Sequence, residues 1–349
     1  MMKKYFYTLV LLLWYQKSNA QKNIQKVKVG IVAFYNLENL YDTQHNTLVD
    51  DLSFTAEGEK HYNKALYQNK LFHLATVIKG IGESVSTDGA ALIGVVEIEN
   101  DTVLKDLVRH PLLRKRDYQV IHYNSKDKRG IDVALLYNPT YFKALESESI
   151  HVSLPYSGSN TYETRDILCV KGLLDGEPIY VFVNHWPSKR GGEERTAISR
   201  ATAAATCRKV INRIIANDTN AKILVMGDMN DNPDSYSVSK ILKAEADATM
   251  LTEGALYNPW WQLYKKGIGT LANQDSWSLF DQIILSQSWL NKEQVGFYYH
   301  SNHIYKKGFM LENSGRYKGY PMRTWDGNNY RGGYSDHFPT YIVVIKRVI

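Results

Sequence analysis

Short β-rich runs alternate with helical stretches along the whole chain, and no Pro/Ser-rich linker, internal repeat or low-complexity block interrupts them. Seven apolar runs are the clearest predicted strands, at 27–34, 91–96, 131–137, 178–184, 222–226, 281–285 and 340–345. The clearest predicted helices are 62–81 and 193–215, and Asn217 closes the second. This alternation is typical of one compact α/β domain.

The first twenty residues have the layout of a secretory signal peptide. Lys3 and Lys4 precede an apolar run over 5–15, and small residues stand at both ends of 18–20. A membrane anchor would need about 20 apolar residues, and this run has about half of that. We therefore expect cleavage after Ala20 and an exported mature chain, 21–349, which forms a single domain in the periplasm or outside the cell and has no transmembrane span.

Composition excludes some classes but does not identify a partner. The chain is 44% hydrophobic and 22% charged, which excludes a disordered protein. Without Lys3, Lys4 and Lys17, 39 of the 42 basic residues remain against 36 acidic ones, so charge alone does not predict nucleic-acid binding. The two cysteines, Cys169 and Cys207, lack zinc-site spacing. Two buried free thiols and a single disulfide both remain open.

Acids, amides and a histidine follow the C-terminal ends of four predicted strands. They are Asn36, Glu38, Glu97, Glu99, His185, Asp228 and Asn230. Strand ends at one edge of a sheet converge in space, so we expect one oxygen-rich pocket there. Carboxylate and amide oxygens suit a hard divalent cation such as Mg²⁺, with Mn²⁺ or Ca²⁺ as alternatives.

Two histidines add groups that handle protons near neutral pH. They are His185 and His337, the latter within 335–339. A hard metal with histidines and basic side chains favours phosphate-ester hydrolysis over acyl or glycosyl transfer. The sequence has neither a Gly-x-Ser-x-Gly elbow nor a Walker-type loop.

Seven short motifs occur in the order of a known family. They are FYNLEN at 34–39, GVVEIEN at 94–100, RGIDVALLY at 129–137, NHWPSKRGG at 184–192, GDMND at 227–231, FDQIILS at 280–286 and SDHFP at 335–339. With these motifs the chain resembles the endonuclease/exonuclease/phosphatase superfamily over nearly the whole mature sequence. The resemblance implies a four-layer α/β sandwich, in which two central β-sheets pack face to face and are flanked by helices.

The resemblance also implies a role for individual residues. Glu97 matches the principal metal ligand, with Asn36 as its partner, Asp336 as an acid beside the metal and Glu38 as a possible assistant. Asp228 and Asn230 match the pair that activates water and holds the phosphate. His337 matches the histidine that contacts the scissile phosphate, and Asp281 matches the carboxylate that fixes its ring.

Leaving-group assistance and phosphate binding are predicted for further residues. His185 or the metal would assist the leaving group. Arg129 and Arg190 adjoin glycines within motifs and are the preferred phosphate contacts, ahead of Lys189 and Arg195.

His185 narrows the expected substrate, because abasic-site endonucleases resemble this pattern but have Tyr at the matching position. A His at this position resembles the pattern of secreted deoxyribonucleases, neutral sphingomyelinases and phosphoinositide phosphatases. We expect a monomeric, Mg²⁺-dependent endonuclease that acts on nucleic acid and has no stable protein partner. The alternatives are a phosphodiesterase or phosphatase for lipid head groups (sphingomyelinase-like) or small phosphate esters, and a binding module on an inactive scaffold.

Two further segments remain open in function. The aromatic cluster 257–261 is either a core or rim cluster or a base-stacking or membrane-dipping loop. The segment 306–331, rich in Gly, Tyr, Arg and Asn, is either a substrate-shaping loop or an irregular connection.

Overall fold

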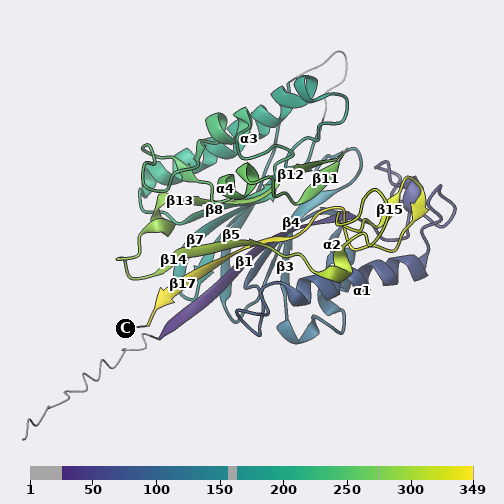
Figure 1. Ribbon diagram of the computed structural model, residues 1–349, viewed down its shortest axis with the longest axis horizontal. Coiled ribbons are helices and arrows are strands. Elements are labelled where there is room, and N and C mark those ends of the chain that lie inside the picture. Colours follow the sequence, from purple (N-terminus) through teal and green to yellow (C-terminus); the bar gives the residue numbers. More distant parts are fainter. Residues whose placement is uncertain (1–25, 156–162, 274, 349) are drawn as a thin grey trace, which may run out of the picture.

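The computed structural model describes residues 26–155, 163–273 and 275–348 and contains two large mixed β-sheets (Figure 1). The predicted signal peptide lies outside these residues. The six-stranded sheet has the order β14 (Phe297–Ile304), β17 (Thr340–Arg347), β1 (Val27–Leu40), β2 (Leu92–Ile98), β4 (Asp132–Tyr137) and β3 (Gln119–His122). The seven-stranded sheet has the order β5 (Phe142–Ile150), β6 (Ile167–Leu174), β7 (Glu177–His185), β8 (Ile223–Asp228), β13 (Asp281–Ser286), β10 (Leu256–Tyr257) and β9 (Ala244–Glu245).

Helices cover the outer faces of both sheets (Figure 1). The helices are α1 (Lys64–Gly80), α2 (Asp101–Arg109), α3 (Glu193–Asn217) and the short α4 (Trp261–Lys265). Two small hairpins, β11 (Leu271–Asn273) with β12 (Ser276–Ser278) and β15 (Trp325–Asp326) with β16 (Asn329–Tyr330), lie outside the sheets. Single turns of 3₁₀ or π helix occur at Leu52–Phe54, Arg114–Arg116, Ser237–Ile241, Gln287–Leu290 and Gly308–Met310.

Side-chain alternation along the strands produces four layers. In β1, Ile31, Ala33 and Tyr35 pack with α1 and α2, whereas Val32 and Phe34 pack with the inner face of the other sheet. A third cluster joins the outer face of the seven-stranded sheet to α3. Because strands with two buried faces carry nearly continuous apolar runs, the seven runs were readable in the sequence. The predicted four-layer sandwich is confirmed.

The two sheets come close together where β2 faces β8. A Cβ added at Gly94 would lie 2.5 Å from the Met226 sulfur, so a side chain at position 94 would displace the facing strand's methionine. Gly94 therefore permits the close packing of the inner layer beneath the strand ends.

The seven predicted strands and both predicted helices are present, although the ends differ. β1 continues to Leu40, well past the predicted end at residue 34, because Asn36 and Glu38 are polar but still buried. The edge strand β5 and helix α2 were not predicted. β5 is mostly exposed and therefore carries a weak apolar pattern. α2 has only nine residues, but Val103, Leu104, Leu107 and Val108 form a buried helical stripe, so a signal for it was available.

Both cysteines are free and buried, Cys169 on β6 and Cys207 on α3. Of the two options left by the sequence, the structure has free thiols.

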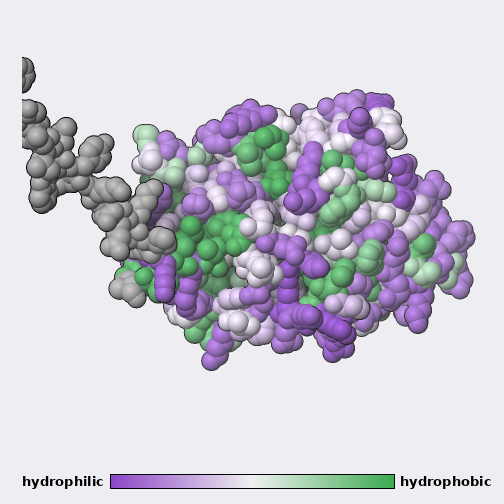
Figure 2. Space-filling view, turned by 60° about the horizontal axis from the view of Figure 1, so that its bottom comes forward, coloured by the Kyte–Doolittle hydropathy of each residue, from purple (hydrophilic) through white to green (hydrophobic). Residues whose placement is uncertain are grey.

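The 257–261 cluster is largely core, because Trp260 is fully buried and its indole N–H donates to the Ile283 carbonyl at 2.9 Å. On the face in Figure 2 hydrophobic side chains form patches separated by hydrophilic ones. Among the described residues, no helix has the length and apolarity to cross a bilayer.

Candidate active site

The polar residues at the strand ends meet at one edge of the sandwich. β1 supplies Asn36, β2 supplies Glu97 and β7 ends at His185, which lies opposite Asp228 at the end of the parallel β8. β13 runs antiparallel to β8, so its first residue, Asp281, also pairs with Asp228. The predicted convergence of strand ends is thus observed.

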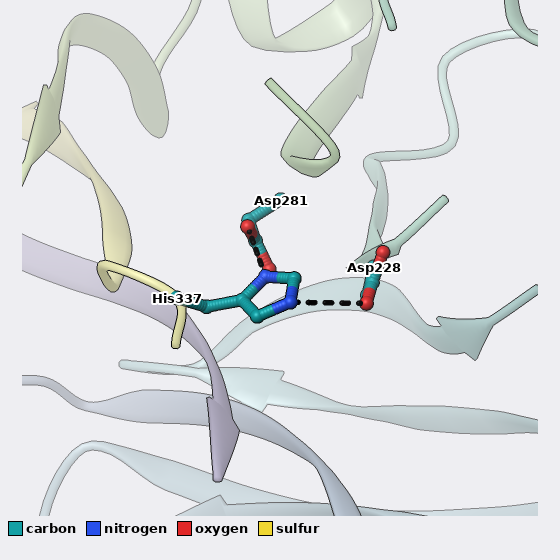
Figure 3. A group of neighbouring side chains, drawn as sticks. All are labelled: Asp228, Asp281 and His337. Carbon is teal, nitrogen blue, oxygen red and sulfur yellow. Dashed lines mark hydrogen bonds and ion pairs between the residues drawn. The ribbon is translucent and has the colours of Figure 1, made fainter. Parts of the chain in front are cut away.

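Asp281, His337 and Asp228 form the buried centre of this edge (Figure 3). His337 Nδ1 donates to Asp281 Oδ2 at 2.8 Å, and His337 Nε2 lies 3.8 Å from Asp228 Oδ2. Burial acts to lower the pKa of His337, but Asp281 and Asp228 outweigh it and raise the pKa well above its ordinary value. The contacts with two acidic side chains therefore favour the charged form of the ring.

Asp228 is a shared acceptor at the centre of the site. Its Oδ2 accepts from Asn36 Nδ2 at 3.0 Å, and its Oδ1 accepts the Asn230 backbone N–H at 2.9 Å. Burial, with Asp281 adding to it, raises the pKa of this carboxyl to about 7. The side chain can thus exchange a proton near neutral pH.

His185 lies 3.8 Å through Nε2 from both Glu97 Oε1 and Asp228 Oδ2. Burial, together with the positive charges of Arg165 and Arg129, lowers its pKa well below the ordinary value. The neutral form of His185 is therefore favoured here, and in that form the ring can offer a hydrogen bond but not a positive charge.

Glu97 and Asp336 keep oxygens that can bind a cation. Glu97 Oε2 accepts the Asn39 N–H at 3.0 Å, whereas Oε1 has only long contacts, 3.6 Å to Arg129 Nη2 and 3.8 Å to His185. Asp336 contacts Arg323 Nη2 at 3.5 Å and His337 Nε2 at 3.9 Å. These carboxylates fit the hard divalent cation that the sequence predicts.

The Asn36 side chain already makes hydrogen bonds within the protein through both its nitrogen and its oxygen. Its Oδ1 accepts the Glu38 N–H at 2.9 Å, which leaves one lone pair for a cation. A different group of possible ligands, Asp228, Asp281 and His337, has its ligand atoms within 4.8 Å of one another. Because the directed His337–Asp281 hydrogen bond occupies one of these atoms, we interpret this second group as a proton-handling site.

Glu38 has a different role from the assistant metal ligand predicted for it. Its two oxygens accept the backbone N–H groups of Thr324 and Trp325, at 2.7 and 3.2 Å. The fully buried Lys70 on α1 donates to Thr324 Oγ1 at 2.7 Å. Glu38 thus anchors the segment before the last motif to β1, and Lys70 anchors it to α1.

Backbone strain accompanies these side chains. Four residues at the strand ends, Glu38, Asn39, Glu97 and Asn230, have φ between 49° and 60°, the left-handed region that side chains other than glycine rarely adopt. Such conformations cluster at functional sites.

The predicted phosphate contacts fall in different places. Arg129 is at the site, where its Nη2 donates to Asn39 Oδ1 at 2.6 Å and lies near Glu97. Arg190 is on an exposed turn, and no side-chain contact with the site residues is found for it in the described part of the chain. Lys189, ranked lower from the sequence, lies 3.4 Å from Asp231 and over the Phe280 ring.

Arg165 was not predicted. It is buried, pairs with Asp127 at 3.1 Å and donates to the Trp186 carbonyl at 2.7 Å. Asn230 Nδ2 donates to the same carbonyl at 2.9 Å, so Arg165 helps to fix a predicted site residue. Its sequence neighbours carry no motif. Lys70, by contrast, falls three and four residues from Tyr67 and Leu74 on the buried stripe of α1, a signal that was available.

Solved structures have the same fold. They include an endonuclease/exonuclease/phosphatase family protein from Bacteroides thetaiotaomicron (16% identity, 93% of this chain and 97% of that chain, TM-score 0.55). A second is D. rerio TDP2 complexed with single strand DNA product (16% identity, 90% of this chain and 98% of that chain, TM-score 0.54). A third is a B. thetaiotaomicron mannosyl-6-phosphatase (17% identity, 90% of this chain and 99% of that chain, TM-score 0.54). No curated protein matches the chain in sequence.

The family comparison covers nearly the whole described chain. Residues 31–346 match the Endonuclease/Exonuclease/phosphatase family, and the matched span contains every predicted motif. The two sheets, the convergent strand ends and this match agree, and the chain therefore belongs to the Endonuclease/Exonuclease/phosphatase family of divalent-metal-dependent phosphoesterases.

Proposed function

We propose that the protein is an exported enzyme that hydrolyses phosphate esters by attack of an activated water. The observation that carries this proposal is the buried Asp281–His337 pair facing Asp228, which combines a proton acceptor with a fixed positive charge. Export rests on the signal-peptide layout of residues 1–20. A cation held by Glu97, Asp336 and Asn36 would add charge neutralisation at the phosphate.

The chain's own residues divide the reaction between them. Asp228 takes a proton from the water as its oxygen bonds to phosphorus, and the bond from phosphorus to the ester oxygen breaks. His337 and Asn230 stabilise the negative charge on the non-bridging oxygens. His185 donates a hydrogen bond to the departing oxygen, which is then protonated from solvent.

The substrate follows from different evidence. The resemblance to secreted deoxyribonucleases predicts nucleic acid, and the fold likeness to TDP2 in complex with a single strand DNA product supports it. A small phosphate ester is the second candidate, supported by the likeness to a mannosyl-6-phosphatase and favoured by a small cavity beside Asp336.

The test is hydrolysis by residues 21–349 of supercoiled plasmid, a bis-aryl phosphodiester and sphingomyelin, each with Mg²⁺ or with EDTA. Asp228→Ala is compared with Asp247→Ala, which changes a fully exposed aspartate. Loss of Asp228 is expected to cost about 3 kcal/mol of transition-state stabilisation, a rate loss on the order of a hundredfold. Plasmid nicking that needs metal and Asp228 would establish the nuclease, and no turnover of any substrate would refute a phosphoesterase.

A further inference from the structure

The geometry points to a binding site for a sugar: we propose that a cavity beside Asp336 binds the polyhydroxylated part of the substrate, so that the substrate is a sugar phosphate. The inference rests on the proposed phosphoesterase function and chooses the second of its two candidate substrates, a small phosphate ester, over nucleic acid. The cavity measures about 260 Å³. That size is just below the usual range for small-molecule sites, and it suits one compact ring rather than a duplex.

The cavity adjoins the reaction centre. Asp336 belongs to its lining, and Asp336 Oδ1 lies 3.9 Å from His337 Nε2. Arg323, also in the lining, contacts the other Asp336 oxygen at 3.5 Å. A phosphate held at His337 would therefore lie beside the wall of the cavity that Asp336 forms.

The lining pairs each of its three arginines with an acid. Arg331 Nη2 donates to both Glu312 oxygens at 3.0 Å, and its Nη1 lies 3.8 Å from Asp326. Arg316 pairs with Asp275 at 2.8 Å, and Arg323 with Asp336. A polyanionic strand would meet as many carboxylates as guanidinium groups here, so the charge pattern gives it no advantage. Hydroxyl groups, which both donate and accept, match such a surface.

Two tyrosines supply the apolar part of the lining. Tyr317 is 52% exposed, and its ring lies 5.8 Å from that of Tyr320 at an interplanar angle of 41°. Tilted rings do not form the parallel slot that would sandwich a flat base between two aromatic faces. A single exposed phenol face beside hydrogen-bonding groups can instead pack against the C–H face of a pyranose.

Backbone hydrogen bonds hold this lining in place. The Glu312 N–H donates to the Tyr320 carbonyl at 2.9 Å, and the Gly319 N–H donates back to the Glu312 carbonyl at 2.8 Å. Glu38 fixes Thr324 and Trp325 from the other side. The segment 306–331 therefore presents a preformed site, which lowers the entropic cost of binding a small ligand.

The experiment compares glucose 6-phosphate and mannose 6-phosphate with an aryl phosphate, which reports the reaction centre alone, and with plasmid. With Mg²⁺ we expect kcat/KM for at least one hexose phosphate to exceed that for the aryl phosphate by about tenfold or more. Tyr317→Ala and Arg331→Met should raise KM for the hexose phosphate about tenfold and leave aryl phosphate turnover unchanged. Tyr236→Ala, which removes a tyrosine that is 68% exposed and outside the lining, is the matched control.

Competition by the free hexose is a second readout. It should inhibit aryl phosphate hydrolysis by the native chain and lose potency in Tyr317→Ala. Three outcomes would overturn the sugar site and leave the phosphoesterase function intact. They are turnover of the aryl phosphate without a preference for a hexose phosphate, a hexose preference that survives both substitutions, and a preference for plasmid. Absence of turnover of all substrates would overturn both.

Discussion

At the scale of single residues, a substitution at Asp281 can separate the effect of its charge on His337 from the effect of its shape. Asp281 is fully buried and also accepts from the Thr270 hydroxyl. Asp281→Asn keeps the shape but removes the charge that holds His337 as an imidazolium. We expect kcat for the bis-aryl phosphodiester to fall on the order of a hundredfold, equivalent to about 3 kcal/mol. Asp247→Asn on the surface is the control, and an unchanged kcat in Asp281→Asn would contradict this role for the pair.

Lys70 is a second residue whose burial predicts a large effect. Lys70→Met leaves the Thr324 hydroxyl without its donor and the buried Glu38 without a nearby positive charge. The free energy of unfolding, measured in urea, should fall by about 1–3 kcal/mol. Lys79→Met, on the exposed side of the same helix, should change it by less than about 0.5 kcal/mol. Equal effects of the two substitutions would show that Lys70 is not an anchor.

At the scale of secondary-structure elements, His122 at the end of β3 joins this strand to α2 and β4. Its Nδ1 lies 2.8 Å from Asp101 at the start of α2, and its Nε2 lies 3.1 Å from Asp132 at the start of β4. Burial opposes the charged ring, but the two carboxylates prevail and raise the pKa of His122 above its ordinary value of 6.5. Because the pKa is higher in the folded state, this stabilisation is complete below pH 6.5 and is lost as pH rises through the raised pKa.

The corresponding measurement is the free energy of unfolding of the native chain and of His122→Gln between about pH 5.5 and pH 9. The difference between them should be largest at the acidic end and shrink with rising pH. His300→Gln, on the surface, should show no such trend. A difference that stays constant with pH would mean that the charge on His122 contributes nothing.

The contact between the sheets gives a prediction of its own. Gly94→Val forces a side chain against Met226, and overpacking of this kind costs about 1–3 kcal/mol of folding free energy. Gly308→Val is the matched control, because a Cβ at that position meets nothing within 4 Å. If both variants unfold at the same urea concentration, the sheets are not in close contact at Gly94.

Prediction from sequence succeeded where a signal lies within one segment. Continuous apolar runs predicted the inner strands. The order of the motifs predicted one site at the strand ends from Asn36, Glu97, His185, Asp228, Asp281 and His337. It failed for features created by contacts between distant segments. Arg165 acts through the Trp186 carbonyl, and the cavity of 306–331 depends on Glu38 from the first strand. The preference for Arg190 over Lys189 as a phosphate contact stays a prediction, and the structure places Lys189 near Asp231.

At the scale of the whole molecule, the layers share strands and should unfold together. β1 contributes to the outer cluster with α1 and α2 and also to the layer between the sheets. We expect one cooperative urea transition for residues 21–349, with far-UV circular dichroism and tryptophan fluorescence coinciding. The fluorescence samples all three clusters, because Trp325, Trp260 and Trp186 lie in different ones. Two separated transitions would contradict the predicted single domain.

The left-handed backbone at Glu38, Asn39, Glu97 and Asn230 limits how stable an active chain can become. A residue other than glycine in this region costs on the order of 1 kcal/mol, and glycine relieves that cost. Glu97→Gly would therefore relax the backbone while deleting the carboxylate that we propose binds the cation. At position 97, selection for thermal stability alone would favour glycine, so we expect the glutamate to persist only under selection for turnover.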